Sequence, residues 1–181
     1  MQSLFKAFTA LVTAALLVAG LATPTAGVAG FNDVGGGAYY ASAVQWMVNS
    51  GITTGTGPCT FDPDANITRG ELAAFLHRSQ GSPDGWAAPF SDVTKHWQKE
   101  PVAWMIDRGI TTGTSPTTFS PDALATRGEI VVFLYRMAGH PWTWSDSHPF
   151  GDVSAEWQHD AITWAADHGI ALVFPDTSPR G

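Results

Sequence analysis

Two stretches of the chain decide its fold: WMVNSGITTGTGPCTFDPDANITRGELAAFLHR, from Trp46 to Arg78, and WMIDRGITTGTSPTTFSPDALATRGEIVVFLYR, from Trp104 to Arg136. They align without a gap, and 21 of the 33 positions are identical. Self-similarity at a fixed spacing marks a repeat protein, in which each copy is one small structural unit. The sequence therefore predicts at least two equivalent units.

A third copy is incomplete. The block Phe-x-Asp-Val precedes both full copies and occurs again at 150–153, followed by Trp157, Trp164 and Gly169 at matching places. Beyond residue 170 the match decays into the fragments Phe-Pro-Asp and Arg-Gly, without the apolar segment that ends the other copies. We expect four parts: a leader at 1–29, and repeats at 30–80, 88–139 and 148–181, the last truncated.

Each copy has the pattern helix, loop, helix. In the second copy the first helix should run from about Trp97 to Arg108, with Gly109 closing it. The loop that follows is dense in Gly, Pro and Thr, which are turn residues. The second helix should start at Thr68 or Thr126 and extend about ten residues. A helix pair of this size cannot bury its own apolar face, so the copies should pack on one another in a mainly α-helical protein.

The first thirty residues resemble a secretory leader. Lys6 is followed by an apolar run from Ala7 to Ala22, and Gly27 and Ala29 fit a signal-peptidase site. The alternative is an uncleaved membrane anchor, but the apolar run is shorter than the ~20 residues that a spanning helix needs. We expect cleavage after Ala29, and no membrane association afterwards.

Charge limits the partners. The chain has a net charge of −7, and removing the leader, whose only charged residue is Lys6, would leave −8. An acidic surface disfavours nucleic acid, so we expect no nucleic-acid partner. An anionic ligand would need a local cluster of arginine.

The shared blocks Phe-x-Asp-Val, Trp, Gly-Ile-x-x-Gly, Thr-Phe-x-Pro and Thr-Arg-Gly-Glu resemble the S-layer homology domain, over about residues 31 to 181. The resemblance implies three repeats in a pseudo-threefold bundle, which hold proteins non-covalently on the bacterial envelope. It also implies a ligand, a secondary cell-wall polysaccharide that often ends in a pyruvate-ketal sugar. The expected location is outside the cell, at the cell wall.

The resemblance implies a set of ligand-binding residues. The family motif Thr-Arg-Ala-Glu, whose arginine meets the anionic group, stands here with glycine in place of alanine. The aspartate of Phe-x-Asp-Val and a glycine near the end of the first helix are also implicated. The expected ligand residues are Arg69, Arg127, Gly70, Gly128, Asp33, Asp92, Gly51 and Gly109, with Asp152 and Gly169 as their matches in the incomplete copy.

The motif also has a purely structural explanation. Thr-x-x-Glu before an apolar run is a capping box, in which the Thr hydroxyl and the Glu carboxylate each accept a backbone N–H at the helix start. It accounts for the structural caps Thr68, Glu71, Thr126 and Glu129.

The capping box does not explain Arg69 and Arg127. Each lies at the first position of a helix, where the dipole disfavours a cation. The glycine beside each costs a helix roughly 1 kcal/mol relative to alanine. Helix N-termini bind anions, and a guanidinium matches a carboxylate, so together they suit an anionic ligand. The rival hypothesis is that each arginine pairs with an acid of a neighbouring repeat, such as Asp33 or Asp92.

Tryptophan is abundant, with eight residues. Trp46, Trp104 and Trp164 occupy matching positions in the first helices, and we expect them to pack between repeats. The remaining candidates for stacking on sugar lie in linkers, at Trp86, Trp142 and Trp144.

Other functions find little support. Asp62 to Asn66 resembles the start of a calcium loop, but Ile67 and Ala73 stand where such a loop needs Gly and Glu. The six histidines lack zinc-ligand spacing, so we expect no metal and no cofactor. No nucleophile motif is present, so we expect no enzyme. The alternatives to anchoring are self-association into a surface array and, more weakly, an accessory role in wall-glycan hydrolysis.

Overall fold

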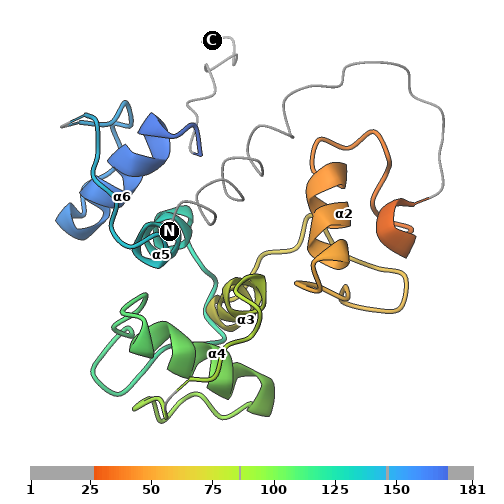
Figure 1. Cartoon of the computed structure of the whole chain (residues 1–181), viewed down its shortest axis with the longest axis horizontal. Helices are drawn as coiled ribbons and strands as arrows, with labels where there is room; N and C mark the ends of the chain where they lie inside the picture. The colour runs from red at the N-terminus through yellow and green to blue at the C-terminus, as the bar shows by residue number, and fades with distance from the viewer. Residues whose placement is uncertain (1–26, 86, 146, 171–181) are drawn as a thin grey trace, which may run out of the picture. The chain divides into compact units, whose positions relative to one another are not determined.

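The computed structural model describes residues 27–85, 87–145 and 147–170. These contain a short 3-10 turn, η2 (Val28–Gly30), and the helices α2 (Ala41–Asn49), α3 (Arg69–Ser79), α4 (His96–Asp107), α5 (Arg127–Met137) and α6 (Glu156–Asp167) (Figure 1). Within the described ranges there are only isolated β-bridges and no strand. The prediction of a mainly α-helical fold is confirmed. The pseudo-threefold arrangement stays a prediction.

The helix limits follow from local signals. Thr68 and Thr126 are the N-caps of α3 and α5, as their sequence predicts. Gly51, Gly109 and Gly169 follow the ends of α2, α4 and α6 with φ near +67°, a left-handed conformation that glycine adopts without strain. The three helices whose limits were predicted, α3, α4 and α5, therefore begin and end within about a residue of the predicted positions.

The packing partners cross the repeat boundaries. The second helix of the first copy, α3, packs on the first helix of the second copy, α4. Likewise α5, from the second copy, packs on α6, from the third. Figure 1 shows each of these two pairs side by side. The prediction that copies pack on one another is thus confirmed, and each packed helix pair is drawn from two successive copies.

The chain divides into two compact units, one ending at Ala125 and one starting at Thr126. The first unit contains two lobes, which we name by their residues: the α2 lobe, 27–67, and the α4 lobe, 68–125, which includes α3. The second unit contains the α6 lobe, 126–170, in which α5 packs on α6.

The cores of the two helix pairs follow one plan. In the α4 lobe the buried residues include Val102, Trp104 and Met105 of α4 and Phe119 of the following loop, each at most 3% exposed. The ring of His77 on α3 lies 5.5 Å from that of Trp104. In the α6 lobe Tyr135 and Trp164 are the matching pair, 5.7 Å apart.

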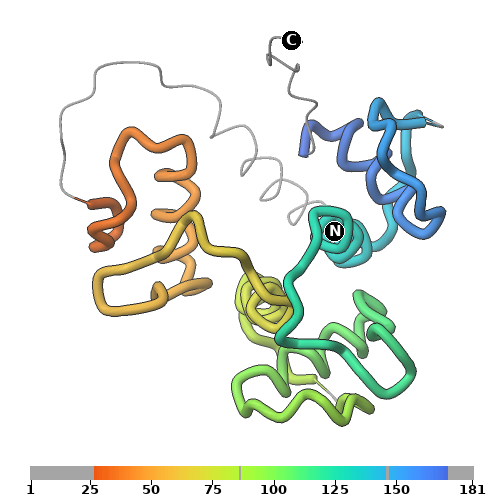
Figure 2. The backbone as a smooth tube through the Cα atoms, turned by 180° about the vertical axis from the view of Figure 1, so that it is seen from behind, coloured from red at the N-terminus to blue at the C-terminus, as the bar shows by residue number. Residues whose placement is uncertain are grey.

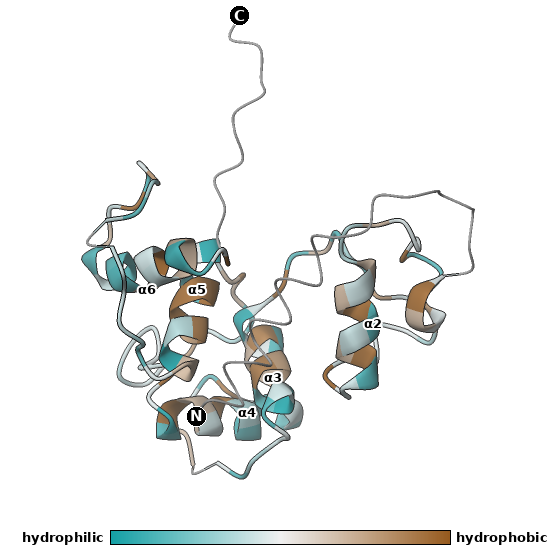
Figure 3. Ribbon diagram, turned by 45° about the horizontal axis from the view of Figure 1, so that its top comes forward, coloured by the Kyte–Doolittle hydropathy of each residue, from teal (hydrophilic) through white to brown (hydrophobic). Residues whose placement is uncertain are grey.

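The α2 lobe has a small core of its own, made of Phe31, Val34, Ala41 and Val44. Val28 and Ala29 pack against it, and Phe61 stacks at 5.6 Å from Phe31. No second helix from an earlier copy exists among the described residues to cover α2. Colouring by hydropathy shows apolar residues along both α3 and α5, the helices that fill this role in the other lobes (Figure 3).

A pair of fragments tests the crossed packing. The fragment 66–126 keeps α3 on α4, whereas the fragment 88–139 keeps one sequence repeat and leaves Trp104 without α3. We expect 66–126 to unfold cooperatively at the higher temperature in circular dichroism, because it buries the Trp104 side chain and its neighbours. A higher melting temperature for 88–139 would contradict the crossed packing.

Candidate functional site

The starts of α3 and α5 carry the four-residue motif and have the same local geometry. The Thr68 hydroxyl accepts the Glu71 amide at 3.2 Å, and the Glu71 carboxylate accepts the Thr68 amide at 2.8 Å. At α5 the distances for Thr126 and Glu129 are 3.2 and 2.9 Å. Both capping boxes leave the first two helical amides, on Arg and Gly, available for other partners.

At α3 those amides bind the loop of the next copy. The Arg69 amide donates to the carbonyl of Ala123 at 2.9 Å, and the Gly70 amide donates to Pro121 at 2.8 Å. The Ala125 amide returns a bond to Ile67 at 3.0 Å. We call this contact between the start of α3 and residues 119–125 the first junction, where the two segments run past each other in Figure 2.

The Arg69 side chain completes the first junction. It is only 3% exposed. Its Nε donates to the Phe119 carbonyl at 2.9 Å, and its guanidinium carbon lies 4.7 Å from the centre of the Phe119 ring. The cation therefore contacts both the backbone and the ring of a fully buried residue of the following copy.

Gly70 lies against Gln98 of α4. A Cβ on Gly70 would be 2.5 Å from Gln98 Nε2 and 3.1 Å from the Pro121 carbonyl oxygen, so only glycine fits without displacement. Gln98 is 1% exposed, so its side-chain amide is buried beside the start of α3. The glycine thus admits a buried amide of the next repeat at this place.

The second junction, at the start of α5, is more open. Gly128 again faces a glutamine, because a Cβ there would be 2.4 Å from Gln158 Nε2. Arg127 is exposed, whereas Arg69 is buried. The amides of Arg127 and Gly128 donate to no described residue. The loop that matches 119–125 falls in 171–181, outside the described residues.

Asp33 and Asp92 fasten the loops of their own copies. Asp92 accepts the amides of Phe119 and Ser120, the latter at 2.7 Å. Asp33 accepts the amide of Asp62 at 2.7 Å and that of Phe61 at 3.0 Å, and these backbone bonds hold the pKa of Asp33 below its usual value. Asp152, the match in the third copy, is exposed.

The predicted site residues thus fall into separate groups. Arg69 and Gly70 meet at the first junction, and Arg127 and Gly128 meet at the second. The carboxylates of Asp33 and Asp92 hold loops by accepting backbone amides of those loops. Gly51 and Gly109 lie at helix ends with left-handed backbone, and nothing lies within 4 Å of where a Cβ would be.

Sequence reasoning missed Gln98 and the carbonyls of Phe119, Pro121 and Ala123 as partners of the α3 start. One signal for the glutamine exists in the sequence. Glutamine occurs at position 98 of the second copy and position 158 of the third, and each of these copies follows a capped helix. The matching residue of the first copy is Tyr40. Carbonyl partners leave no trace in side-chain patterns.

The tryptophans divide into two classes. Trp104 and Trp164 are 3% and 2% exposed, as predicted for packing between repeats. For Trp46 that prediction is wrong, because its side chain is 41% exposed on the uncovered face of α2. The linker residues Trp142 and Trp144 are 82% and 78% exposed, and Trp86 lies outside the described residues.

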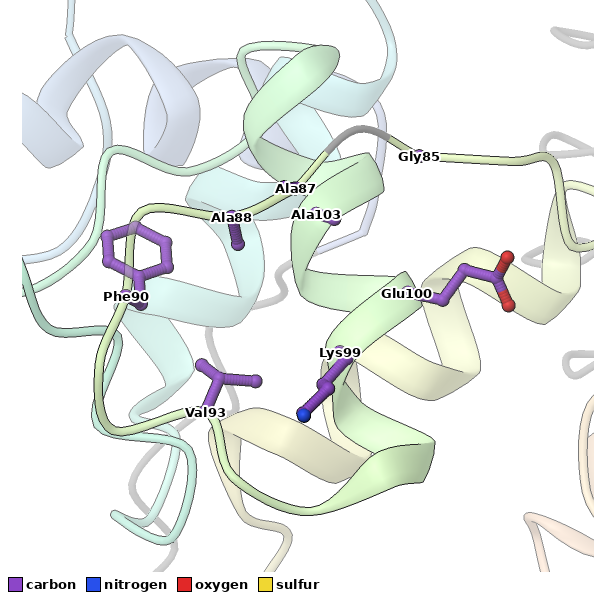
Figure 4. Close-up of a pocket in the computed structure, with 8 residues that line it drawn as sticks. All are labelled: Gly85, Ala87, Ala88, Phe90, Val93, Lys99, Glu100 and Ala103. Atoms are coloured by element: carbon purple, nitrogen blue, oxygen red, sulfur yellow. The ribbon is translucent and has the colours of Figure 1, made fainter.

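A pocket of about 440 Å³ lies between the linker before Phe90 and helix α4 (Figure 4). Its walls are mostly small and apolar, with Phe90 and Val93 on one side. Figure 4 shows the Lys99 ammonium directed toward Val93 and the Glu100 carboxylate directed away. Lys99 and Glu100 are the charged residues that line it.

The described residues lack both a metal-binding cluster and a membrane-spanning helix. No group of three or more His, Cys, Asp or Glu residues lies close enough there to hold a metal ion. No helix in the same ranges is long and apolar enough to cross a membrane.

Comparison with known proteins explains the repeats. The model of the S-layer homology domain matches residues 30–73 and 89–131. The chain carries two S-layer homology domains. Membership of this family, with relatives among S-layer and cell-surface proteins, makes it a secreted protein of the cell surface.

Three relatives illustrate the similarity. The Surface-layer 125 kDa protein of Lysinibacillus sphaericus is 31% identical over 91% of this chain and 14% of its own length. S-layer protein EA1 of Bacillus anthracis is 27% identical over 66% of this chain and 14% of its own. The Cellulosome-anchoring protein of Acetivibrio thermocellus is 25% identical over 66% and 29%. The chain spans less than a third of each relative, so the similarity concerns the S-layer homology region.

Substituting Gly70 and Gly128 in turn should show that the first junction is packed more tightly than the second. Gly70→Ala places a methyl group against the buried Gln98 and the Pro121 carbonyl, and we expect a loss of about 1–3 kcal/mol in the free energy of unfolding. Gly128→Ala should cost less, because Gln158 is only partly buried and can move. The measurement is urea unfolding, with Gly35→Ala, in open space, as the control. Equal stability of Gly70→Ala and Gly35→Ala would contradict the close packing at the first junction.

Proposed function

We propose that this chain anchors non-covalently to the bacterial cell envelope by binding an anionic secondary cell-wall polysaccharide, with a pyruvate-ketal sugar as its charged group. The S-layer homology domains and the Cellulosome-anchoring relative support an anchoring role. A leader at 1–29, cleaved after Ala29, would deliver the protein to the wall. Cleavage there would also remove Val28 and Ala29 from the edge of the α2 lobe core.

The observation that carries the choice of ligand is the open start of α5. Arg127 is exposed there, and the amides of Arg127 and Gly128 point from a helix N-terminus without a described partner. A helix N-terminus favours an anion, and a guanidinium binds a carboxylate through two parallel hydrogen bonds. A pyruvate ketal presents one carboxylate, the group that an arginine beside free helix amides would bind.

The two arginines should therefore act differently. At the first junction the matching groups, which are the amides of Arg69 and Gly70 and the Arg69 guanidinium, already bind residues 119–125. Arg69 would thus hold two copies together, and Arg127 would supply the accessible cation. Asp33, Asp92, Gly51 and Gly109 would keep the loops and helix ends of their own copies in shape.

The test compares Arg127→Ala with Arg69→Ala. A hydrogen bond to a charged group contributes about 1.5–3 kcal/mol, so Arg127→Ala should weaken binding by roughly 10- to 100-fold. Its melting temperature should not fall, because an exposed cation is removed from a helix N-terminus. Arg69→Ala should lower the melting temperature by several degrees, because it leaves the Phe119 carbonyl and ring without their partner.

Binding is measured by pulldown with purified wall polysaccharide, before and after chemical removal of pyruvate. Arg108→Ala is the matched control, since Arg108 is an exposed arginine at the end of α4 rather than at a helix start. Undiminished binding by Arg127→Ala, or equal binding to polymer without pyruvate, would contradict the proposal.

A further inference from the structure

Two exposed tryptophans lie on the linker before the third copy. Trp142 and Trp144 are 82% and 78% exposed, and both lie outside the helices. A single exposed tryptophan needs no explanation, whereas apolar surface gathered in one place marks an interaction site. Counting back from the shared Phe-x-Asp-Val block, Ser82 and Asp84 occupy the matching positions of the second copy. The repeat fold therefore does not require tryptophan at either position.

Both indoles project from the same side of the linker. The two tryptophans alternate with Pro141, Thr143 and Ser145, which are partly buried. Side chains two residues apart share one side of an extended segment. The alternation therefore indicates that the segment turns one side to its own lobe and presents both indoles to solvent.

The linker is fixed at this place by Asp167, the last residue of α6. The Asp167 carboxylate accepts the Trp144 amide at 2.7 Å, the Ser145 amide at 3.1 Å and the Ser145 hydroxyl at 2.8 Å. Desolvation raises the pKa of Asp167, but these hydrogen bonds and the nearby His168 outweigh it and hold that pKa below its usual value. The carboxylate thus stays charged at neutral and mildly acidic pH. Aromatic side chains on a fixed backbone lose little entropy when a ligand binds.

The composition around the linker limits the class of partner. The sequence has five acids and no lysine or arginine between Ala138 and Ile170. This charge disfavours an anionic polymer, a nucleic acid or an anionic lipid surface. The neighbouring Thr143, Ser145 and Ser147 are small and polar, unlike the apolar centre of a protein interface. An uncharged sugar meets both conditions, because its C–H face packs on an indole and its hydroxyl groups bond to polar groups.

We propose that Trp142 and Trp144 form a stacking platform for an uncharged polysaccharide, with one pyranose ring on each indole. The ligand class differs from that of the anchoring site at α5, which would bind a carboxylate through Arg127. The platform does not rest on the anchoring function. Its chemistry fits both the uncharged backbone of a wall polymer and a separate β-linked glycan, and the test has an arm for each source.

The test is NMR titration of the purified secreted protein with two uncharged sugars. One is wall polysaccharide stripped of pyruvate and confirmed to carry no charge, and the other is cellohexaose. Binding is followed through the indole N–H signals of Trp142 and Trp144, assigned with Trp142→Phe and Trp144→Phe. We expect both signals to shift with at least one of the sugars, while the signal of the buried Trp164 stays in place. The sugar that shifts them identifies the source.

Variants separate stacking from a structural role. Trp142→Ala and Trp144→Ala should each weaken binding at least about fivefold and leave the melting temperature unchanged, because both side chains are exposed. Trp157→Ala removes a 56% exposed tryptophan from α6 of the same lobe and should bind normally, as the matched control. Asp167→Ala, which frees the two amides, should weaken binding, and Asp167→Asn, which keeps an acceptor oxygen, should weaken it less. Arg127→Ala should leave this binding unchanged, so the platform and the anchoring site can fail independently.

Three results would overturn the proposal. The two indole signals could stay fixed with both sugars at about 10 mM, a concentration that detects a Kd near 1 mM. Trp157→Ala could weaken binding as much as Trp144→Ala, which would place the sugar elsewhere. Protein concentration, or vesicles of phosphatidylcholine, could shift the two signals where neither sugar does, which would mean self-association or a membrane surface.

Discussion

The structure depends on the capture of one helix start by the loop of the next copy. The first amides of a helix have no partner within the helix, and a buried start without partners is costly. At the first junction the carbonyls of Ala123 and Pro121 accept these amides, and Phe119 accepts the side chain of Arg69. This contact explains why the helix pairs cross the repeat boundaries. It also explains why Gly70, an unfavourable helix residue, occupies a position that Gln98 approaches closely.

The same motif has two roles because its surroundings differ. Where residues 119–125 are in place, the arginine is buried and joins two copies. At α5 the arginine is exposed, and the first two helical amides donate to no described residue. A short motif can thus serve both as a connector between repeats and as a candidate anion site.

Local features of this fold could be predicted from the sequence, and the choice of packing partners could not. The capping threonines, the closing glycines and the helix limits depend on residues within one turn, so their patterns are visible in the chain. The burial of Arg69 depends on the carbonyls of a loop fifty residues away, and carbonyls carry no side-chain signature. The prediction for Trp46 was wrong for a related reason. Its sequence context matches that of Trp104, but no described helix covers it.

Amide hydrogen exchange tests the capture of the helix start most directly. The amides of Arg69 and Gly70 would be unprotected in an isolated helix, because they precede the first intrahelical bond. Their bonds to Ala123 and Pro121 should slow exchange to a rate near that of Leu72, which lies within the helix. We expect protection at least about 100-fold greater than for the amides of Arg127 and Gly128. Exchange of Arg69 and Gly70 at the rate of an unstructured peptide would contradict the account.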